Sequence, residues 1–229
     1  MSGRGTRSDR AVATQQSILA AAEQLFAEHG VANVSNRQIG LAAGQGNNTA
    51  VSYHFGSRSG LIRAIVRAHT EQIESIRLRM VEQAEGSTAT RDWVACMVEP
   101  FALHLADLGV PSWFARFSAQ VMSDPSHREA VARESLNSPS LTRAVEEVHR
   151  CLPDLPEEIR LERQDMTRQL MIHMIAERED ALANGRPTSR GSWHRAAAGL
   201  TDAVTGLWSA PVSTGASDMV PEGAVTGGP

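Results

Sequence analysis

Cysteine is scarce in this chain of 229 residues, which contains only Cys96 and Cys151. Two cysteines are too few for a disulfide framework, and they show no zinc-module spacing, so we expect a cytoplasmic protein in a reducing compartment. Long apolar runs are also missing. No stretch approaches the roughly eighteen apolar residues of a membrane span, and the arginines of the N-terminus are not followed by the apolar segment of a signal peptide.

Aromatic residues make up only 4% of the chain, and β-branched residues rarely alternate with polar ones, so signals for β-strands are nearly absent. Apolar residues recur instead at steps of three and four. This periodicity predicts an all-α fold of one large or two small domains, long enough to bury its own core. The predicted helices span residues 14–29, 35–43, 48–54, 59–85, 90–108, 112–123, 138–151, 156–183 and 192–209.

Lysine is absent, so all 22 basic residues are arginines, and the charge is unevenly distributed. Residues 1–70 hold seven arginines and three acidic residues, a net charge of +4. Residues 71–229 hold fifteen arginines and twenty-three acidic residues, a net charge of −8. A small basic front joined to a larger acidic back indicates that the front contacts a polyanion while the back has another role.

Two short helices joined by a glycine turn are predicted between residues 35 and 54. The segment Ser35-Asn36-Arg37-Gln38 is a capping box that begins the first helix, and Gly44 ends that helix. Asn47 is a good N-cap for the second helix. This arrangement is typical of a helix-turn-helix, whose second helix enters the major groove of DNA, although an ordinary corner of two helices has the same pattern.

Three segments carry a more specific signal: Ile39-Gly40-Leu41-Ala42-Ala43-Gly44, Val51-Ser52-Tyr53-His54-Phe55-Gly56-Ser57-Arg58 and Leu61-Ile62-Arg63-Ala64-Ile65. Over about residues 14–66 the chain resembles the DNA-binding domain of the tetracycline-repressor (TetR) family of bacterial regulators. The remaining residues resemble the family only in their all-helical layout. Two departures affect the base contacts: eight residues separate Gly44 from Tyr53, one more than usual in the family, and Ser52 stands where the family often has an aromatic residue.

The resemblance implies a division of the chain into five parts. These are a disordered arm (1–11), a helix-turn-helix DNA-binding domain (12–58), a linking helix (59–85), a ligand-binding and dimerisation domain (86–210) and a disordered tail (211–229).

The resemblance and the chemistry of the side chains together assign a DNA-binding surface. Asparagine amides read adenine edges, a threonine methyl group contacts thymine, and tyrosine hydroxyls and arginines bind phosphates. Asn47 could instead only cap its helix, His54 could be a structural histidine, and the arginines could be solvated surface charges. The candidate DNA-binding residues are Arg37, Asn47, Asn48, Thr49, Ser52, Tyr53, His54 and Arg58.

Methionine and aromatic residues recur on three predicted helices of the back domain. Such side chains, with a few polar anchors, suit a pliable ligand pocket, although each of them could equally lie in packed core. The histidines and cysteines there lack the close spacing of metal ligands, so we expect no metal ion and no cofactor. The candidate ligand-binding residues are Met97, Phe101, His104, Trp113, Phe117, Met166, Leu170, His173 and Met174.

The last predicted helix has one apolar stripe with alanines that permit close approach. With the 156–183 helix it resembles the four-helix dimer interface of the family, and a dimer is required because one short helix reads too few bases. Packing within the monomer would produce the same stripe. The candidate interface residues are Trp193, Ala197, Leu200, Val204, Leu207 and Trp208.

The function expected from these features is transcriptional regulation. A homodimer would bind a palindromic operator in double-stranded DNA, as a repressor that a small apolar or amphipathic ligand releases. A ligand-independent DNA-binding regulator is the main alternative. A small all-helical enzyme is a weaker one, because no nucleophile, base and orienting group form a recognisable constellation and no phosphate-binding loop appears.

Overall fold

The computed structural model describes residues 3–46, 49–128 and 138–213, and the secondary structure in these ranges consists of helices alone. The all-α prediction is confirmed. The predicted helices agree with the observed ones to within a few residues, except at the start of the first helix. The elements are α1 (Gly3–His29), the 3₁₀ turn η1 (Val31–Asn33), α2 (Asn36–Ala42), α3 (Ala50–Phe55), α4 (Arg58–Gln83), α5 (Thr90–Leu108), α6 (Phe114–Ser123), α8 (Pro139–Cys151), α9 (Glu157–Ala183) and α10 (Trp193–Ser209).

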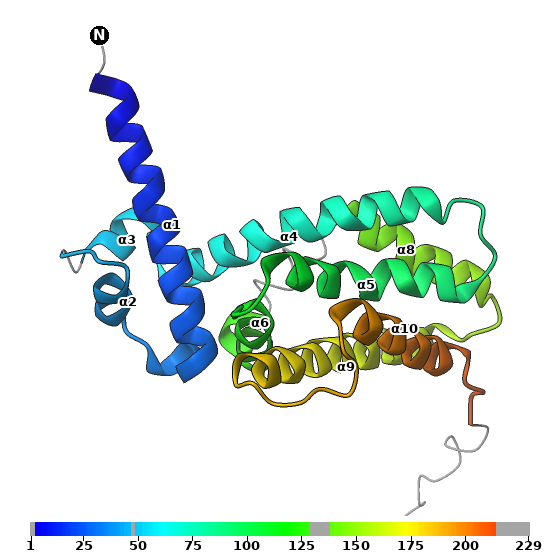
Figure 1. Cartoon of the computed structure of the whole chain (residues 1–229). Coiled ribbons are helices and arrows are strands. Elements are labelled where there is room, and N and C mark those ends of the chain that lie inside the picture. The colour runs from blue at the N-terminus through cyan, green and yellow to red at the C-terminus, as the bar shows by residue number, and fades with distance from the viewer. Residues whose placement is uncertain (1–2, 47–48, 129–137, 214–229) are drawn as a thin grey trace, which may run out of the picture.

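The helices form a small front and an elongated back (Figure 1). Helices α1, α2 and α3 lie together at one end, and α4 leads from them along the length of the molecule. In the back, α5 packs against α4, α8 and α10, while α6 packs against both α1 and α9. Helix α6 therefore connects the front to the back. Within the described ranges, no helix has the length and apolar character needed to cross a membrane.

Helix α1 begins earlier than the sequence predicts. Residues 3–11, expected to belong to a disordered arm, form its first turns and project beyond the rest of the molecule (Figure 1). The physical reason is that a helix already nucleated over Thr14–His29 extends at little cost, because each added residue gains a hydrogen bond. Residues 9–13 are exposed, so this part of the helix contributes nothing to the core. Most of the predicted tail, residues 214–229, lies outside the described residues.

The apolar interior forms two clusters, and their boundary does not follow the division between front and back. The first cluster combines side chains of the front with side chains of α5, α6 and α9, such as Phe26, Ile62, Leu105, Phe117 and Ile175. The second lies among α5, α8 and α10 and includes Trp93, Val94, Met97, Val148 and Trp208. The front therefore shares a continuous core with the adjoining part of the back.

Helix α9 buries polar side chains on its inner face. Buried Arg163 donates hydrogen bonds to the carbonyl oxygens of Trp208 and Ala210 and so caps the end of α10. The Thr167 hydroxyl accepts a hydrogen bond of 3.0 Å from the indole nitrogen of Trp208. Helix α9 therefore buries polar side chains that have partners and leaves some apolar side chains, such as Met166, exposed.

Glu179, also on α9, is bound at the start of α6. Its carboxylate accepts hydrogen bonds from the backbone nitrogens of Ala115 (3.1 Å) and Arg116 (2.9 Å) and from the Ser112 hydroxyl (2.9 Å). The Arg116 side chain completes an ion pair at 3.3 Å. A carboxylate at a helix N-terminus satisfies backbone donors that would otherwise be unpaired and complements the helix dipole. Glu179 therefore fastens α6 to α9.

Candidate nucleic-acid interface

Both ends of α2 are determined by local side-chain and backbone contacts. At its start, the Ser35 hydroxyl accepts from the Gln38 backbone nitrogen at 3.3 Å, and the Ser35 backbone nitrogen donates to the Gln38 side chain at 2.8 Å, which is the predicted capping box. At its end, Gly44 has a φ of 68° and the Gln45 nitrogen donates to the Gly40 carbonyl at 2.8 Å. This is the Schellman arrangement, in which glycine takes the left-handed position.

Helix α3 starts later than predicted. Thr49 is its N-cap residue and Ala50 its first helical residue, so the predicted N-cap at Asn47 lies two positions too early. The later start is consistent with the additional residue between Gly44 and Tyr53, which lengthens the turn. Asn47 and Asn48 themselves lie outside the described residues, and their roles stay predictions.

Gly60 permits the close approach of α3 and α4. A Cβ atom at this position would lie 2.1 Å from the carbonyl oxygen of Phe55, the last residue of α3, which no side chain tolerates. The Gly60 backbone nitrogen donates to the Ser57 hydroxyl at 3.0 Å, so Ser57 caps α4 at the same corner. The angle between α3, the second helix of the helix-turn-helix, and α4 therefore depends on Gly60, which the sequence analysis did not single out.

Arg58 makes several contacts within the protein. Its guanidinium donates hydrogen bonds to the carbonyl oxygens of Val31 and Val34 and lies over the ring of Phe26, 4.9 Å from the centroid. Burial lowers the pKa of Arg58. These contacts of one terminal nitrogen tie the start of α4 to the turn between α1 and α2. Arg58 therefore has a structural role that the sequence analysis did not assign, and its phosphate contact stays a prediction.

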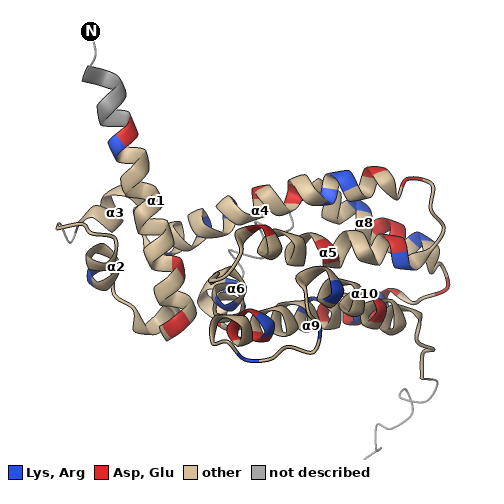
Figure 2. Ribbon diagram, viewed as in Figure 1, with Lys and Arg blue, Asp and Glu red and all other residues tan. Residues whose placement is uncertain are grey.

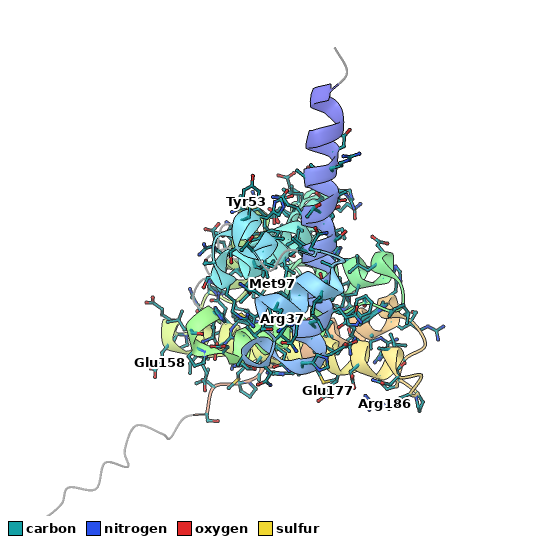
Figure 3. The ribbon with its side chains drawn as sticks, turned by 90° about the vertical axis from the view of Figure 1, so that its left-hand side faces the viewer. Arg37, Tyr53, Met97, Glu158, Glu177 and Arg186 are labelled. Carbon is teal, nitrogen blue, oxygen red and sulfur yellow. The ribbon has the colours of Figure 1, made fainter. Side chains whose placement is uncertain are left out.

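The other described candidates lie together at one end of the molecule. Arg37, Thr49, Ser52 and Tyr53 are exposed, and Tyr53 has 83% of its surface accessible. Figure 3 views the molecule from this end, with Arg37 on α2 and Tyr53 on α3 both at the surface. His54 is half-buried, and its ring meets that of Tyr53 edge-on at 5.1 Å.

Leu41 on α2 is a surface residue that the sequence analysis did not propose. Its side chain is 63% exposed, an unusual state for leucine on a short helix. Since Ile39 and Gly40 are the buried positions of α2, Leu41 lies on the outer face of this helix. It adds an apolar contact site beside Arg37.

Few formal charges lie on the helix-turn-helix itself (Figure 2). Across α2 and α3 the single charged residue is Arg37, while exposed Arg10 and Arg63 belong to the neighbouring helices α1 and α4. Arg63 was part of the matching sequence string but was not assigned a role. This distribution allows base-edge contacts at the centre of the surface and phosphate contacts at its margins.

The predicted ligand-binding residues lie in different surroundings. Phe101 stacks on Phe114, and Phe117 is fully buried against Phe26, so both belong to packed core. Met97 lies in the second apolar cluster. His104 is buried and Trp113 is half-buried, whereas Met166, His173 and Met174 are exposed on the outer face of α9. These side chains are thus distributed over packed core and exposed surface, and their assignment to one ligand site stays a prediction.

A pocket of about 220 Å³ does lie nearby, between α9 and α10 with Ala102 of α5 at its base. Of the predicted ligand-binding residues, Leu170 and Met174 line this pocket. Arg178 and Arg190 also contribute to its lining. Within the described part of the chain, no three side chains of histidine, cysteine, aspartate or glutamate are placed to hold a metal ion.

The apolar stripe of α10 faces the interior of the subunit. Trp193, Ala197, Val204 and Trp208 are buried, and α10 packs principally on α5. Leu200 and Leu207 are half-buried against the same interior. The stripe predicted as a dimer interface is therefore a core face, because a helix buried against its own subunit and one buried against a partner show the same apolar periodicity.

Comparison with known proteins agrees with this geometry. The model described as "Bacterial regulatory proteins, tetR family" matches residues 18–65, and the model "Tetracyclin repressor-like, C-terminal domain" matches residues 95–206. A solved chain from Mesorhizobium loti MAFF303099, described as a TetR-family transcriptional regulator, is 14% identical and has a TM-score of 0.47, covering 85% of this chain and 96% of its own. No curated protein matches.

The two family models together cover the helix-turn-helix with its neighbouring helices and most of the back, in the order in which they occur in the structure. The chain therefore belongs to the TetR family of bacterial transcriptional regulators, with an N-terminal DNA-binding domain and a C-terminal helical domain.

Proposed function

We propose that the protein is a homodimeric repressor that binds a palindromic operator and is released by a small molecule. The main support is the exposed surface formed by Arg37, Thr49, Ser52 and Tyr53. Helix α2 is capped at both ends, and the end of α3 lies in close contact with α4. Base recognition requires exposed polar side chains on a backbone whose position is fixed, since a helix that changes position discriminates poorly between bases. Arg58 supports this surface from behind.

The second copy packs, in this proposal, on the outer faces of α9 and α10. Met166, Leu170 and Met174 recur at four-residue intervals on α9, and Met166 and Met174 are 45% and 52% exposed. On α10, Ala203 and Gly206 are exposed and small, so a partner helix can approach closely. This face replaces the buried stripe as the candidate interface.

The pocket between α9 and α10 is the proposed effector site. Leu170 and Met174 belong both to its lining and to the proposed dimer face, so a second copy would adjoin it. An occupant there would favour one arrangement of the two subunits over another. The distance between the recognition helices would then change, which shifts the population away from the DNA-binding form.

Selection of bound DNA from random sequence tests operator recognition. We expect a near-palindrome whose half-sites are centred about 34–36 Å apart or at a multiple of that distance. Tyr53→Ala should lower affinity for the selected DNA, while Leu78→Ala, a change at an exposed position of α4, should not. Enrichment of no sequence, or of a single asymmetric half-site, would contradict the proposal.

Light scattering tests the dimer face. The double variant Met166→Glu, Met174→Glu should be monomeric, because it places unpaired carboxylates in the proposed interface. Leu78→Glu is the matched control, since it adds a carboxylate at a similarly exposed apolar position of α4. A double variant that stays dimeric would show that the subunits associate through another face.

A ligand-independent regulator remains the alternative function. The fluorescent amphipathic anion 1-anilinonaphthalene-8-sulfonate can probe the pocket, and Ala203→Trp should fill it, because Ala203 is an exposed lining residue. Because Ala203 also lies on the proposed dimer face, Ser189→Trp, at an exposed lining residue on the connection between α9 and α10, is the deciding variant. We expect the probe to bind the native protein and to weaken operator binding, and Ser189→Trp to lose both effects. Equal probe binding by the two proteins, with no effect on DNA, would favour the alternative.

A further inference from the structure

Three titratable side chains from three helices form a chain of hydrogen bonds between the front and the back. Glu23 on α1 contacts His69 on α4, with 2.8 Å between Oε2 and Nε2. The Nδ1 atom of His69 lies 2.8 Å from Nε2 of His104 on α5. Glu23 and His69 have side chains that are only 14% exposed, and His104 is buried. The DNA-binding domain is thereby linked through α4 to the back domain.

Aromatic rings enclose this chain. The ring of Phe114, on α6, stacks on His69 with 3.8 Å between centroids and an angle of 14°, and it meets His104 edge-on at 6.0 Å. Phe114 also belongs to a column of rings that runs from Phe101 through Phe117 to Phe26 on α1. The chain of hydrogen bonds and the column of rings therefore cross the boundary between the front and the back at the same place.

The hydrogen bond between the two imidazoles depends on how many protons they hold. With both rings neutral, Nε2 of His69 donates to Glu23, and Nε2 of His104 donates to Nδ1 of His69. With one added proton, His69 donates from both nitrogens, and Nε2 of His104 accepts. With a second added proton, both facing nitrogens carry hydrogen and both rings are positive. The bond is then lost, and two like charges adjoin in a buried site.

We propose that Glu23, His69 and His104 form a proton-controlled latch, which holds the DNA-binding front against the back domain and opens when both imidazoles are protonated. The latch would make the orientation of the recognition helix sensitive to acid. Its effect on operator binding rests on the proposed function, whereas the latch itself does not.

The surroundings of His104 favour the closed, less protonated state. Burial, and next the charge of His69, lower the pKa of His104 to about 4, while Asp107 opposes the shift. His69 and Asp107, with Glu23 acting through His69, are titratable groups that bear on His104, and α6 presents the Phe114 ring to it. With an ordinary pKa of 6.5 in the open form, the ratio of open to closed molecules rises roughly 30-fold from pH 7.5 to pH 5.0.

The expected direction of the pH effect separates the latch from simple electrostatics. Protonation of histidines adds positive charge, which by itself strengthens attraction to the phosphate backbone. Opening of the latch instead makes the distance between the α3 helices of the two subunits variable and weakens operator binding. A fall in affinity with acid is therefore the signature of the latch.

An intramolecular distance tests the latch without DNA and without a dimer. Spin labels can be placed at two exposed positions, by Ala32→Cys in the front and Glu158→Cys in the back, with Cys151→Ser to prevent labelling of the half-buried native thiol. Dilution with unlabelled protein isolates the pair within one subunit. We expect the distance distribution to shift or broaden between pH 7.5 and pH 5.0. An unchanged distribution would overturn the latch.

Substitutions sharpen this test. His104→Asn cannot become charged, so its distance distribution should not change with pH, while His29→Gln, at an exposed histidine of α1, should behave as the native protein. Glu23→Gln keeps a hydrogen-bond acceptor but removes the negative charge that stabilises protonated imidazole in the closed form, so the transition should begin at higher pH. A pH response retained in His104→Asn would overturn the proposal.

Imidazole NMR of the protein without histidine substitutions provides a check that does not depend on the folding of any variant. The His104 ring should take up its proton over the same pH range as the distance change, and a different range would overturn the latch. Operator affinity should fall over this interval, by at most roughly 30-fold if opening abolishes binding. If no operator is bound at any pH, the proposed function fails, and the distance measurement still decides the latch.

Discussion

The front and the back of the molecule are held together by different kinds of contact. In the front, the short helices α2 and α3 adjoin glycine turns, and the half-buried Arg58 donates to backbone carbonyls. In the back, charged side chains such as Glu179 and Arg163 lie on the inner face of α9 and bind the ends of other helices. Local sequence therefore specifies the front, whereas contacts between distant segments specify the back.

The same difference appears in the centre of α5. Pro100 has no backbone N–H to donate to the Cys96 carbonyl, and Nε of buried Arg77 on α4 donates to that oxygen at 3.1 Å. Glu74 pairs with the same guanidinium at 3.2 Å. Burial lowers the pKa of Arg77, and Glu74 opposes the shift. The backbone hydrogen bond that α5 lacks at Pro100 is thus replaced by one from a charged side chain of α4, which no local pattern predicts.

The largest effect that distinguishes the two regions is expected for Glu179→Ala. It leaves the first backbone donors of α6 and the Arg116 side chain without their carboxylate in a buried site. Loss of one partner of such a pair costs about 3–5 kcal/mol of unfolding free energy. Thermal or urea unfolding measures this loss, and Glu177→Ala, at an exposed neighbouring position, should be nearly neutral. Equal stability of the two variants would show that the back does not depend on this charge.

The second effect is a loss of stability in acid. The pKa of His104 is about 4 in the folded protein and 6.5 ordinarily, so folding favours the neutral ring. The resulting stabilisation is complete above pH 6.5 and is lost as the pH falls towards 4, by about 3 kcal/mol in total. Urea unfolding at pH 7 and pH 4 should therefore show a steeper loss in the native protein than in His104→Asn. Parallel losses would contradict the assignment.

A smaller effect is expected at the corner of the front. Gly60→Ala forces a Cβ atom against the Phe55 carbonyl, which should cost about 1–3 kcal/mol and displace α3 from α4. Operator affinity should fall with stability. Gly46→Ala is the control, because a Cβ atom there would meet nothing within 4 Å. If both variants bind DNA alike, the angle between α3 and α4 is not critical for recognition.

The smallest change in stability is expected for Arg37→Ala, in contrast to Arg58→Ala. Arg37 is exposed, so its removal should alter stability by less than about 0.5 kcal/mol while reducing the salt dependence of DNA binding by about one unit. Arg58→Ala should instead destabilise the fold by about 1–3 kcal/mol, because two buried carbonyls lose their donor. Unfolding and salt titrations of both variants decide between the roles. A reversed pattern would support the phosphate contact at Arg58.

Much of the fold and the DNA-binding surface could be predicted from sequence, whereas the faces of the back helices could not. The capping box at Ser35 and the glycine at Gly44 act within a few residues, so their effects are readable along the chain. The exposed position of Tyr53 agrees with its assignment. The outward position of Met166 and Met174 was missed, because polar residues of α9 such as Arg163 and Glu179 are buried through partners on distant segments.

The sequence by itself determined the helices, their approximate ends, the helix-turn-helix and the family, because these follow from local hydrogen bonding, turn chemistry and periodicity. Only the tertiary structure decided that Arg58 holds the fold and that the stripe of α10 is buried within the subunit. It also decided that His69 meets both Glu23 and His104. These outcomes depend on which distant groups come together, since a buried charge or imidazole takes its role from its partners and not from its place in the chain.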